Sequence, residues 1–549
     1  MTWVRNTLAA ACVAAAAVGA FAQEQTPTVK KEYARTVEIA EPSAFTGVKD
    51  TRFVLTKDLT VPRVGALKFK QCEHIEIDLD GHTITYNTED YNPRKEWGAG
   101  VQVSYSRDVV IKGGTIVQAE MDPAQALGVG YTDDVVIDGM NIIVRRALRD
   151  REKGGVTPHP TTAISIYRYG DALKKVPPKA AYKNVIRNCY LENGRMALGE
   201  AYDYEITGNV LVNAHCGINA RGSRRPPAGR RGAKHKIHHN LIQSLRVVGW
   251  KSPCALYLAA GRECEVFENK VASDDARGFI SSGGGLEKNV FHHNEISARY
   301  KSASAIGYID NRPYGIWTRN SWGTVIHHNR ILVINSSPFK GGRNYAIGIL
   351  CAKFRGQGPS NDEFTIRDNV ITVMHDFANQ TSTGISFGPN SKGIFGKNET
   401  IRNNVIRAQT LCFNLDAEYF DPDSKNICAG NRMIKPGKHD AGWRVANLKL
   451  PAGNPIETEK PDATAPAAPT GLKLRSHMGR AIIEWKWNAE DDVVGYWIYR
   501  NGKRIPGTRF RGATFYIDVT PTDGDRYSVS ARDFSGNESQ RSFAVVFKK

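Results

Sequence analysis

The sequence predicts an all-β chain, with a right-handed parallel β-helix of about 11 to 12 coils followed by a small β-sandwich. Three observations predict it: a motif that recurs from about residue 110 to residue 431, three short strands that fit each copy, and a change of composition near residue 450. The motif is clearest at Val325–Ile331, which reads VIHHNRI. A constant core separated by inserts of variable length is typical of a solenoid whose loops are free to grow.

Each copy of the motif is aligned on its Asn. Spacings range from 21 residues (Asn188 to Asn209) to 49 residues (Gly139 to Asn188), and Gly113 and Gly139 take the same place in two earlier copies. We expect the Asn at a tight turn, because it tolerates the left-handed conformation and its side chain can bond to the next coil. Apolar residues on both sides of the turn predict two short strands. The copies are centred on Asn188, Asn209, Asn240, Asn269, Asn294, Asn329, Asn369, Asn404 and Asn431.

A third short strand lies between successive turns, for example at residues 163–169, 217–221, 255–260 and 305–310. Three parallel strands per coil, with coils about 4.8 Å apart, define a β-helix. The left-handed form needs a strict hexapeptide repeat, and leucine-rich repeats need Leu at fixed offsets. Neither pattern is present.

The remaining segments are predicted from composition. Arg5, an apolar run and an Ala-x-Ala site at Ala20–Ala22 predict a secretory signal, and no later run is apolar enough to span a membrane. We therefore expect an exported protein. The predicted segments are a signal peptide at 1–22, a cap at 23–50, the β-helix catalytic domain at 51–450, a linker rich in Pro, Ala, Thr and Glu at 451–466, and the sandwich at 467–549.

The chain is basic, with a formal charge of +18 at pH 7. For an exported protein this charge favours an acidic polysaccharide over nucleic acid as partner. A basic background typical of some bacterial lineages is the alternative. The oligomeric state stays open.

Eight cysteines remain after Cys12 leaves with the signal. Export permits disulfides, and we expect most of these residues to be buried thiols, with bridges between Cys254 and Cys264 and between Cys412 and Cys428. No zinc-site spacing is present.

Alternating strands and turns fill the last 80 or so residues, including Ile483-Glu484-Trp485, GYWIYRNG from Gly495 to Gly502, and YSVSARD from Tyr527 to Asp533. This part resembles a fibronectin type III domain, with Trp485 as its core tryptophan and Tyr527 near its corner tyrosine. The resemblance implies an accessory or spacer module without catalytic residues.

The Asn-turn repeat resembles the right-handed parallel β-helix superfamily of pectate lyase-like carbohydrate-active enzymes, over residues 50 to 450. Secreted members are mostly polysaccharide lyases, glycoside hydrolases and uronate epimerases. The resemblance implies a substrate that lies along the sheet of third strands, between walls made by the long inserts.

β-Elimination from a uronate requires neutralisation of the carboxylate, a base for the adjacent proton and an acid for the leaving oxygen. Strand alternation and the long inserts supply candidates for the groove face, although an outward Arg or Tyr on a β-helix is usually plain surface. Arg221 and Arg168 suit carboxylate binding, Tyr257 or Lys251 suits acid and base work, and His159 would close over the substrate. The candidate catalytic residues are Arg221, Tyr257, Lys251, Arg168, His159 and Glu200, and the candidate substrate-binding residues are Tyr167, Asn219, Arg224, Arg225, Asp310 and Trp317.

Hydrolysis of a sulfated or neutral glycan is the alternative reaction, and it would need two carboxyl groups that face one groove. Glu200 or Asp203 with Asp310, or Asp416 with Glu418, are available, and none forms a distinctive pair. A third hypothesis is a non-catalytic surface or adhesin solenoid. Long inserts on one face argue against it.

Three His-His-Asn runs raise the question of a metal site. We expect these histidines to stack between coils, because no carboxylate recurs beside them, and we predict no metal site there. Calcium is the one cofactor left open, since the acidic cluster at 416–423 offers oxygen ligands.

Overall fold

The computed structural model describes residues 31–88, 98–119, 125–144, 162–167, 183–214, 216–221, 233–245, 254–259, 261–301, 312–338, 345–352, 363–387, 397–415, 424–435, 443–447, 449–459, 463–505 and 511–549. This part of the chain is all-β, and it contains no helix long and apolar enough to cross a membrane. The predicted signal peptide lies outside the described residues.

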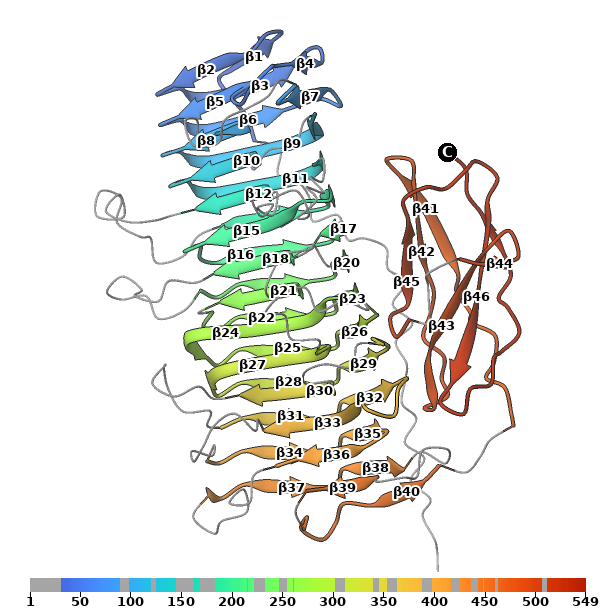
Figure 1. Cartoon of the computed structure of the whole chain (residues 1–549). Helices are drawn as coiled ribbons and strands as arrows, with labels where there is room; N and C mark the ends of the chain where they lie inside the picture. The colour runs from blue at the N-terminus through green and yellow to red at the C-terminus, as the bar shows by residue number, and fades with distance from the viewer. Residues whose placement is uncertain are drawn as a thin grey trace, which may run out of the picture.

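A parallel sheet of fourteen strands runs the length of one side of the molecule, and we call it the front sheet (Figure 1). Each strand pairs in parallel with the next at intervals of one coil, so the predicted parallel β-helix is confirmed. The front sheet comprises β2 (Ser43–Thr46), β5 (Leu67–Lys70), β8 (Ala99–Ser104), β10 (Gln125–Gly130), β12 (Thr162–Tyr167), β15 (Arg195–Gly199), β18 (Cys216–Arg221), β21 (Cys254–Ala259), β24 (Arg277–Glu287), β27 (Tyr314–Trp322), β30 (Tyr345–Ala352), β33 (Thr381–Phe387), β36 (Leu411–Asn414) and β39 (Arg444–Ala446).

A second parallel sheet forms the other two sides of each coil. The side that follows the front sheet in each coil comprises β1 (Arg35–Ile39), β3 (Lys49–Leu55), β6 (Glu73–Asp78), β9 (Arg107–Gln118), β11 (Asp133–Ile143), β13 (Asn184–Arg187), β16 (Tyr204–Thr207), β19 (Lys236–His238), β22 (Glu265–Phe267), β25 (Val290–His292), β28 (Val325–His327), β31 (Thr365–Arg367), β34 (Thr400–Arg402) and β37 (Ile427–Ala429). The long strands β9 and β11 continue into the third side.

The third side, which we call the rear face, comprises β4 (Leu59–Thr60), β7 (Thr83–Tyr86), β14 (Tyr190–Glu192), β17 (Val210–Ala214), β20 (Leu241–Leu245), β23 (Lys270–Asp274), β26 (Glu295–Tyr300), β29 (Arg330–Asn335), β32 (Val370–His375), β35 (Val405–Ala408), β38 (Arg432–Lys435) and β40 (Ile456–Thr458). Fourteen front strands make the stack longer than the predicted 11 to 12 coils. The stack already begins within the predicted cap and extends to β40, past the predicted boundary at residue 450.

In each tight turn of the repeat, the residue in the left-handed conformation comes one position before the recurring Asn. His239, His293 and His328 have φ of 54°, 53° and 53°. The Asn that follows each of them is buried. Asn188 has φ of 55° and so occupies the left-handed position, as Gly113 and Gly139 do at 68° and 63°. Alignment of these three residues with the other Asn copies is therefore wrong by one residue.

The buried Asn side chains form a ladder through the coils, which confirms the predicted hydrogen bonding between them. Each Asn Oδ1 accepts the backbone N–H of the preceding coil's Asn at 3.0 to 3.2 Å and its side-chain Nδ2 at 2.9 to 3.0 Å. The ladder starts at Cys189, whose N–H donates to Asn209 Oδ1. It continues through Asn209, Asn240, Asn269, Asn294, Asn329, Asn369, Asn404, Asn431 and Asn454.

A column of glycines lets the front sheet approach the rear face inside the coils. A Cβ at Gly278, Gly315, Gly348 or Gly384 would lie 2.3 to 2.5 Å from an Ile Cγ2 of the rear face, which is too close for any side chain. Gly348 and the next residue, Ile349, both face inward, so the inward–outward alternation of the strand shifts by one residue at this point. Ile347 therefore packs in an outer cluster with Tyr314 and Leu350.

The C-terminal residues form a β-sandwich of two antiparallel sheets. One sheet contains β41 (Lys473–His477), β42 (Arg480–Glu484) and β45 (Phe515–Asp518), and the other contains β44 (Lys503–Arg504), β43 (Val493–Arg500), β46 (Arg526–Asp533) and β47 (Val545–Val546). Trp485, Tyr496 and Tyr527 are buried in its core, and the Tyr527 hydroxyl donates to Asp518 Oδ2 at 2.8 Å. The fibronectin type III assignment stays a prediction.

The sandwich packs directly on the rear face of the β-helix (Figure 1). Phe515 and Ile517 of β45 pack against Tyr190, Val210 and Leu241 of three successive coils. Polar contacts flank this apolar cluster, including two hydrogen bonds from Arg480 to Glu192 and one from Gln243 Nε2 to the Ile517 carbonyl. The sandwich is thus a docked module, and the outer surface of the front sheet lies on the side of the β-helix away from it.

Candidate functional site

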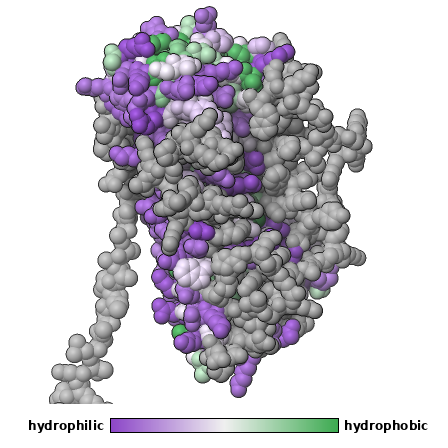
Figure 2. Space-filling model, turned by 90° about the vertical axis from the view of Figure 1, so that its left-hand side faces the viewer, coloured by the Kyte–Doolittle hydropathy of each residue, from purple (hydrophilic) through white to green (hydrophobic). Residues whose placement is uncertain are grey.

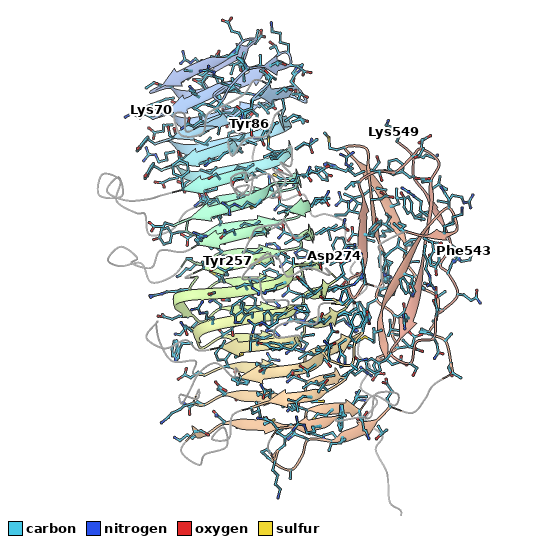
Figure 3. The ribbon with its side chains drawn as sticks, viewed as in Figure 1. Lys70, Tyr86, Tyr257, Asp274, Phe543 and Lys549 are labelled. Atoms are coloured by element: carbon cyan, nitrogen blue, oxygen red, sulfur yellow. The ribbon has the colours of Figure 1, made fainter. Side chains whose placement is uncertain are left out.

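The middle of the front sheet carries a continuous row of outward side chains. Strand pairing places Asn219, Tyr257, Ile280, Trp317 and Leu350 in register on five successive strands. A second row, two residues further along each strand, runs through Arg221, Ala259, Ser282, Arg319 and Ala352. Figure 3 shows Tyr257 on this side and Asp274 on the side of the sandwich.

Two arginines of the second row can reach a ligand on the sheet. Arg221 is exposed, and its Nε donates to Asn219 Oδ1 at 3.3 Å. Arg319 is partly buried, and this burial lowers its pKa while the nearby Tyr257 phenol raises it. The Tyr257 hydroxyl therefore lies close enough to the Arg319 guanidinium to interact with its charge.

Two further arginines are buried among aromatic rings. Arg277 is 4% exposed, and its guanidinium carbon lies 5.1 Å from the ring centroids of both Tyr314 and Trp317. Arg312, 7% exposed, lies 4.8 Å from the Tyr345 ring centroid. Cation–π contact of this kind holds a guanidinium in a fixed place. We call the set the basic–aromatic patch, defined as Arg221, Tyr257, Arg277, Arg312, Tyr314, Trp317, Arg319 and Tyr345.

Carboxylates are missing from the strand segments of the patch. Residues 216–221, 254–259, 277–282, 314–319 and 345–352 contain no Asp or Glu, whereas three of the four patch arginines lie within them. Figure 2 looks onto the side of the molecule that is on the left in Figure 1, where most described residues are hydrophilic. The described patch therefore combines guanidinium groups with aromatic rings and has no carboxylate in these strand segments.

Cys216 and Cys254 lie beneath this patch on neighbouring strands, with their sulfur atoms 3.7 Å apart. Both are free thiols, as are Cys264, Cys412 and Cys428. The predicted bridges from Cys254 to Cys264 and from Cys412 to Cys428 are therefore wrong in this structure. Sequence spacing does not show that Cys216 and Cys254 lie side by side, because residues 38 apart become neighbours only when the coils stack.

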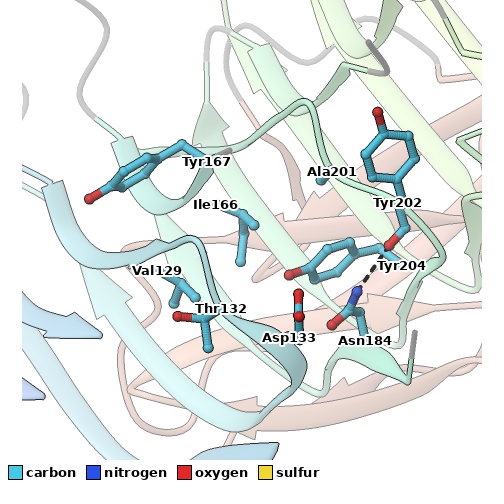
Figure 4. Close-up of a pocket in the computed structure, with 9 residues that line it drawn as sticks. All are labelled: Val129, Thr132, Asp133, Ile166, Tyr167, Asn184, Ala201, Tyr202 and Tyr204. Atoms are coloured by element: carbon cyan, nitrogen blue, oxygen red, sulfur yellow. Dashed lines mark hydrogen bonds between the residues drawn. The ribbon is translucent and has the colours of Figure 1, made fainter. Parts of the chain in front are cut away.

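A small pocket lies closer to the N-terminal end, at the corner that follows the front sheet (Figure 4). It holds about 270 Å³ of empty space including its mouth, and three tyrosines, Tyr167, Tyr202 and Tyr204, line it together with Asp133 and Asn184. Asn184 Nδ2 donates to the Tyr202 carbonyl at 2.9 Å, which ties two coils together at the pocket wall. The pocket offers hydroxyl, amide and carboxyl groups on an aromatic lining.

Glu200 lies next to this pocket, immediately before Ala201 of its lining. It occupies the turn after β15 with φ of 52°, and burial raises the pKa of its carboxyl. Asp133, 5% exposed, is the first residue of β11 and follows β10, which lies two strands away from β15 in the front sheet. These two carboxyl groups belong to one corner of the molecule, although sequence spacing did not pair them.

The structure divides the predicted site residues into three groups. Asn219, Arg221, Tyr257 and Trp317 lie together on the central front sheet, and Tyr167 and Glu200 belong to the pocket corner. Asp203 follows the same turn as Glu200. The other predicted residues lie outside the described part of the chain: His159, Arg168, Arg224, Arg225, Lys251, Asp310, Asp416 and Glu418.

Sequence reasoning missed Arg277, Arg312 and Arg319. The third strand predicted at residues 305–310 lies outside the described residues, and β27, which pairs with both β24 and β30, is a front strand that the prediction did not include. The signal that could have found it is Tyr314-Gly315-Ile316, which repeats the Gly-apolar start of Gly278-Phe279 and Gly348-Ile349.

The histidine pairs at the tight turns stack between coils as predicted. His292 and His327 are parallel with ring centroids 4.9 Å apart, and so are His293 and His328. Within the described ranges, no group of three or more His, Cys, Asp and Glu side chains is arranged to hold a metal ion. The acidic cluster considered for calcium lies outside these ranges.

Comparisons with known proteins give no family. No family model matches the chain, and a search of curated proteins finds no match. Among solved structures, a variant of the tailspike protein of E. coli bacteriophage HK620, in complex with a pentasaccharide, aligns with 93% of this chain and 85% of its own at 9% identity and a TM-score of 0.38.

Two further solved structures are less similar in shape. Tailspike protein 3 of bacteriophage CBA120 aligns at 12% identity and a TM-score of 0.33, over 83% of this chain and 64% of its own. The Clostridium perfringens spore cortex lytic enzyme SleM aligns at 13% identity and a TM-score of 0.14, over 31% of this chain and 68% of its own. At these scores, function has to be inferred from the geometry of this chain alone.

Proposed function

We propose that this protein is an exported enzyme that cleaves an acidic, uronate-containing polysaccharide by β-elimination at the basic–aromatic patch. The observation that carries the proposal is the arginine content of the patch and the lack of any carboxylate in its strand segments. A surface of this kind attracts carboxylate or sulfate groups, and it lacks the paired acids that hydrolysis would need there.

The chemistry follows from the second row of side chains. Arg319 and Arg221 would bind the uronate carboxylate and neutralise it, which acidifies the neighbouring C–H. Tyr257 would act as the base that takes up that proton, the electron pair would form the C=C bond, and the glycosidic C–O bond would break. The leaving oxygen would then take a proton back from the Tyr257 hydroxyl.

Aromatic side chains suit the rest of the sugar. Trp317 is only partly buried, and its ring lies against Tyr257 and Ile280 in one cluster. Such a ring offers apolar surface to the C–H face of a pyranose, and the formal charge of +18 favours a polyanion.

A glycoside hydrolase is the second candidate, and the pocket corner favours it. The raised pKa of Glu200 suits a general acid, and the buried Asp133 of the same corner suits a base or nucleophile. This reaction would take place at a different position from the elimination, so the two candidates predict different inactive variants.

The test incubates the purified protein with a panel of uronate-containing and sulfated polysaccharides. Both ultraviolet absorbance of the unsaturated product and new reducing ends are followed. We expect both signals to rise together on a uronate polymer. Reducing ends without absorbance would replace the lyase with the hydrolase, and neither signal on any polymer would favour a non-catalytic solenoid.

A further inference from the structure

Three tyrosines line the edge of the front sheet between its N-terminal end and the patch. The rings of Tyr105 and Tyr131 are parallel, with centroids 4.9 Å apart and an interplanar angle of 9°. Tyr167 meets Tyr131 edge to face, with centroids 5.8 Å apart. Tyr105 is 44% exposed, although tyrosines of the coil interior such as Tyr86 are fully buried. The three rings form a continuous aromatic surface, which we call the tyrosine column.

The backbone aims these rings away from the coil. Tyr105 and Tyr131 have φ of 52° and 53°, a left-handed conformation that bulky residues seldom adopt. The equivalent turn position holds Gln71 in one neighbouring coil, with φ of 55°. The turn itself therefore fixes the direction of the side chain. The turn does not require an aromatic residue, since Gln71 adopts the same conformation.

Tyr167 is fitted to its place by a glycine. A Cβ on Gly130 would lie 2.4 Å from the Tyr167 ring, so the ring covers this glycine on the outer surface of the sheet. Burial against these neighbours raises the pKa of the Tyr167 phenol, while a hydrogen bond with Gln102 lowers it. The Tyr167 ring is thus held in one place, edge to face with the Tyr131 ring.

The column is continuous with the basic–aromatic patch. One register position runs through Lys70, Ser104, Gly130, Tyr167, Gly199 and Arg221 on successive front strands. Lys70 and Arg221 are both exposed, so cations lie at the two ends of this line. Six strands at the ordinary strand spacing make it about 24 Å long.

We propose that the tyrosine column and Lys70 bind an acidic polysaccharide that extends along the stack from the patch, so that the enzyme acts within long chains. This inference rests on the proposed function, because it extends the substrate of the same sheet. Aromatic faces would hold successive sugar rings, and Lys70 would pair with a carboxylate of the same chain.

The test compares the double variant Y105A/Y131A with the unchanged protein on a uronate polymer and on a short oligosaccharide of the same sugar. Loss of two stacking contacts should raise KM for the polymer roughly tenfold, with kcat and the values for the oligosaccharide unchanged. Y105F/Y131F keeps the rings and should keep the polymer KM. Phe543→Ala removes an aromatic side chain that is 98% exposed on the sandwich, and it serves as the matched control.

Binding is measured separately by retardation in gels that contain the polymer, so that the tyrosine column is tested even without turnover. Loss of retardation in Y105A/Y131A alone supports polymer binding by the tyrosine column. This result would hold even if no polymer were cleaved and the proposed function failed. Equal retardation of all variants, or an unchanged polymer KM, overturns it. Unaltered thermal transitions show that each variant is folded.

Discussion

At the scale of single residues, His235 shows how a coil deals with a buried polar position. It is fully buried, and its Nδ1 accepts the Tyr204 backbone N–H at 3.3 Å. Asn184 and Asn289 do the same work elsewhere in the stack, where their Oδ1 atoms accept the N–H groups of Val135 and Cys264. Among these acceptors, His235 is the one that titrates.

Burial lowers the pKa of His235 to about 4. The unfolded chain therefore binds a proton that the folded chain does not bind between pH ~6.5 and pH ~4, and the free energy of unfolding falls as the pH decreases through this window. His235→Asn keeps an acceptor without a titrating group. Chemical denaturation at pH 7 and pH 4 should show that the variant loses less stability than the unchanged protein, by on the order of 3 kcal/mol. Equal losses would show that another group causes the acid sensitivity.

Arg319 carries the sharpest prediction about activity. Arg319→Lys keeps the charge but removes the planar fork, so kcat/KM on a uronate polymer should fall by about 100-fold with the thermal transition unchanged. Arg444→Lys makes the same exchange on exposed β39, far from the patch, and should leave kcat/KM unchanged. Similar losses in both variants would point to general electrostatics rather than a site.

Arg221 is one of the predicted site residues that the structure also places on the candidate surface. Arg221→Ala should abolish cleavage and leave the thermal transition unchanged, because the side chain is exposed and its hydrogen bond within the patch is the one to Asn219. Absorbance of the unsaturated product measures the cleavage. Undiminished turnover would remove Arg221 from the site.

Site residues could be predicted from the sequence where strand alternation held. Asn219, Arg221 and Tyr257 were found this way, and the structure places all three on the front sheet. Arg277 and Arg312 could not be found, since their surroundings depend on the rings of Trp317 and Tyr345, which lie 40 and 33 residues further along the chain. Asp133 and Glu200 share a corner only because coils of unequal length stack there.

At the scale of elements, the Asn ladder is the main device that aligns one coil on the next. Asn294 Oδ1 accepts from Asn269 through both N–H and Nδ2, and its own Nδ2 donates to the Val266 carbonyl and to Asn329. All these groups are buried. Their loss would leave several donors and acceptors unpaired in a dry interior.

Asn294→Ala should lower the free energy of unfolding by about 3 kcal/mol or more, measured by denaturant titration. Asn454→Ala removes the last Asn of the ladder, which is partly exposed, so water can replace its partners and the loss should be smaller. A loss at position 454 equal to that at position 294 would contradict the ladder as a source of stability.

The parallel β-helix could be predicted because its repeat is written in residues that face the interior. The position of the left-handed residue could not be predicted, because Gly, Asn, His, Glu and Asp all occur there. The recurring Asn next to it is the more obvious residue on which to align the copies. The effect of the glycine column could not be predicted either, because it moves the strand alternation by one residue and leaves Ile347 on the outer side. Both features are shifts of one residue within a correct coil.

At the scale of the whole molecule, the sandwich is joined to the β-helix by a buried ion pair. Arg480 makes two hydrogen bonds to Glu192, at 3.0 and 3.1 Å, and the Tyr190 hydroxyl donates to the same carboxylate at 2.8 Å. Glu192 is 8% exposed. A carboxylate in this position needs its partner.

Arg480→Met should destabilise the protein by about 3 kcal/mol, because it leaves the Glu192 charge buried and unpaired. The double variant E192Q/R480M removes that charge and should recover much of the loss. Differential scanning calorimetry measures both. If the double variant is no more stable than R480M, the interface does not depend on this charge pair.

Docking of the sandwich also changes how the stack should come apart. In an array of repeats each coil touches only its neighbours, so the ends can fray while the middle stays folded. Here one docked module contacts coils from β11, where His477 bonds to Asn141, to β38, where Arg432 pairs with Asp491. Opening any one of these coils disturbs the shared module, so the covered coils form a single cooperative unit. We therefore expect slow and uniform amide hydrogen exchange from β11 to β38. Exchange should be faster in the uncovered coils before β11.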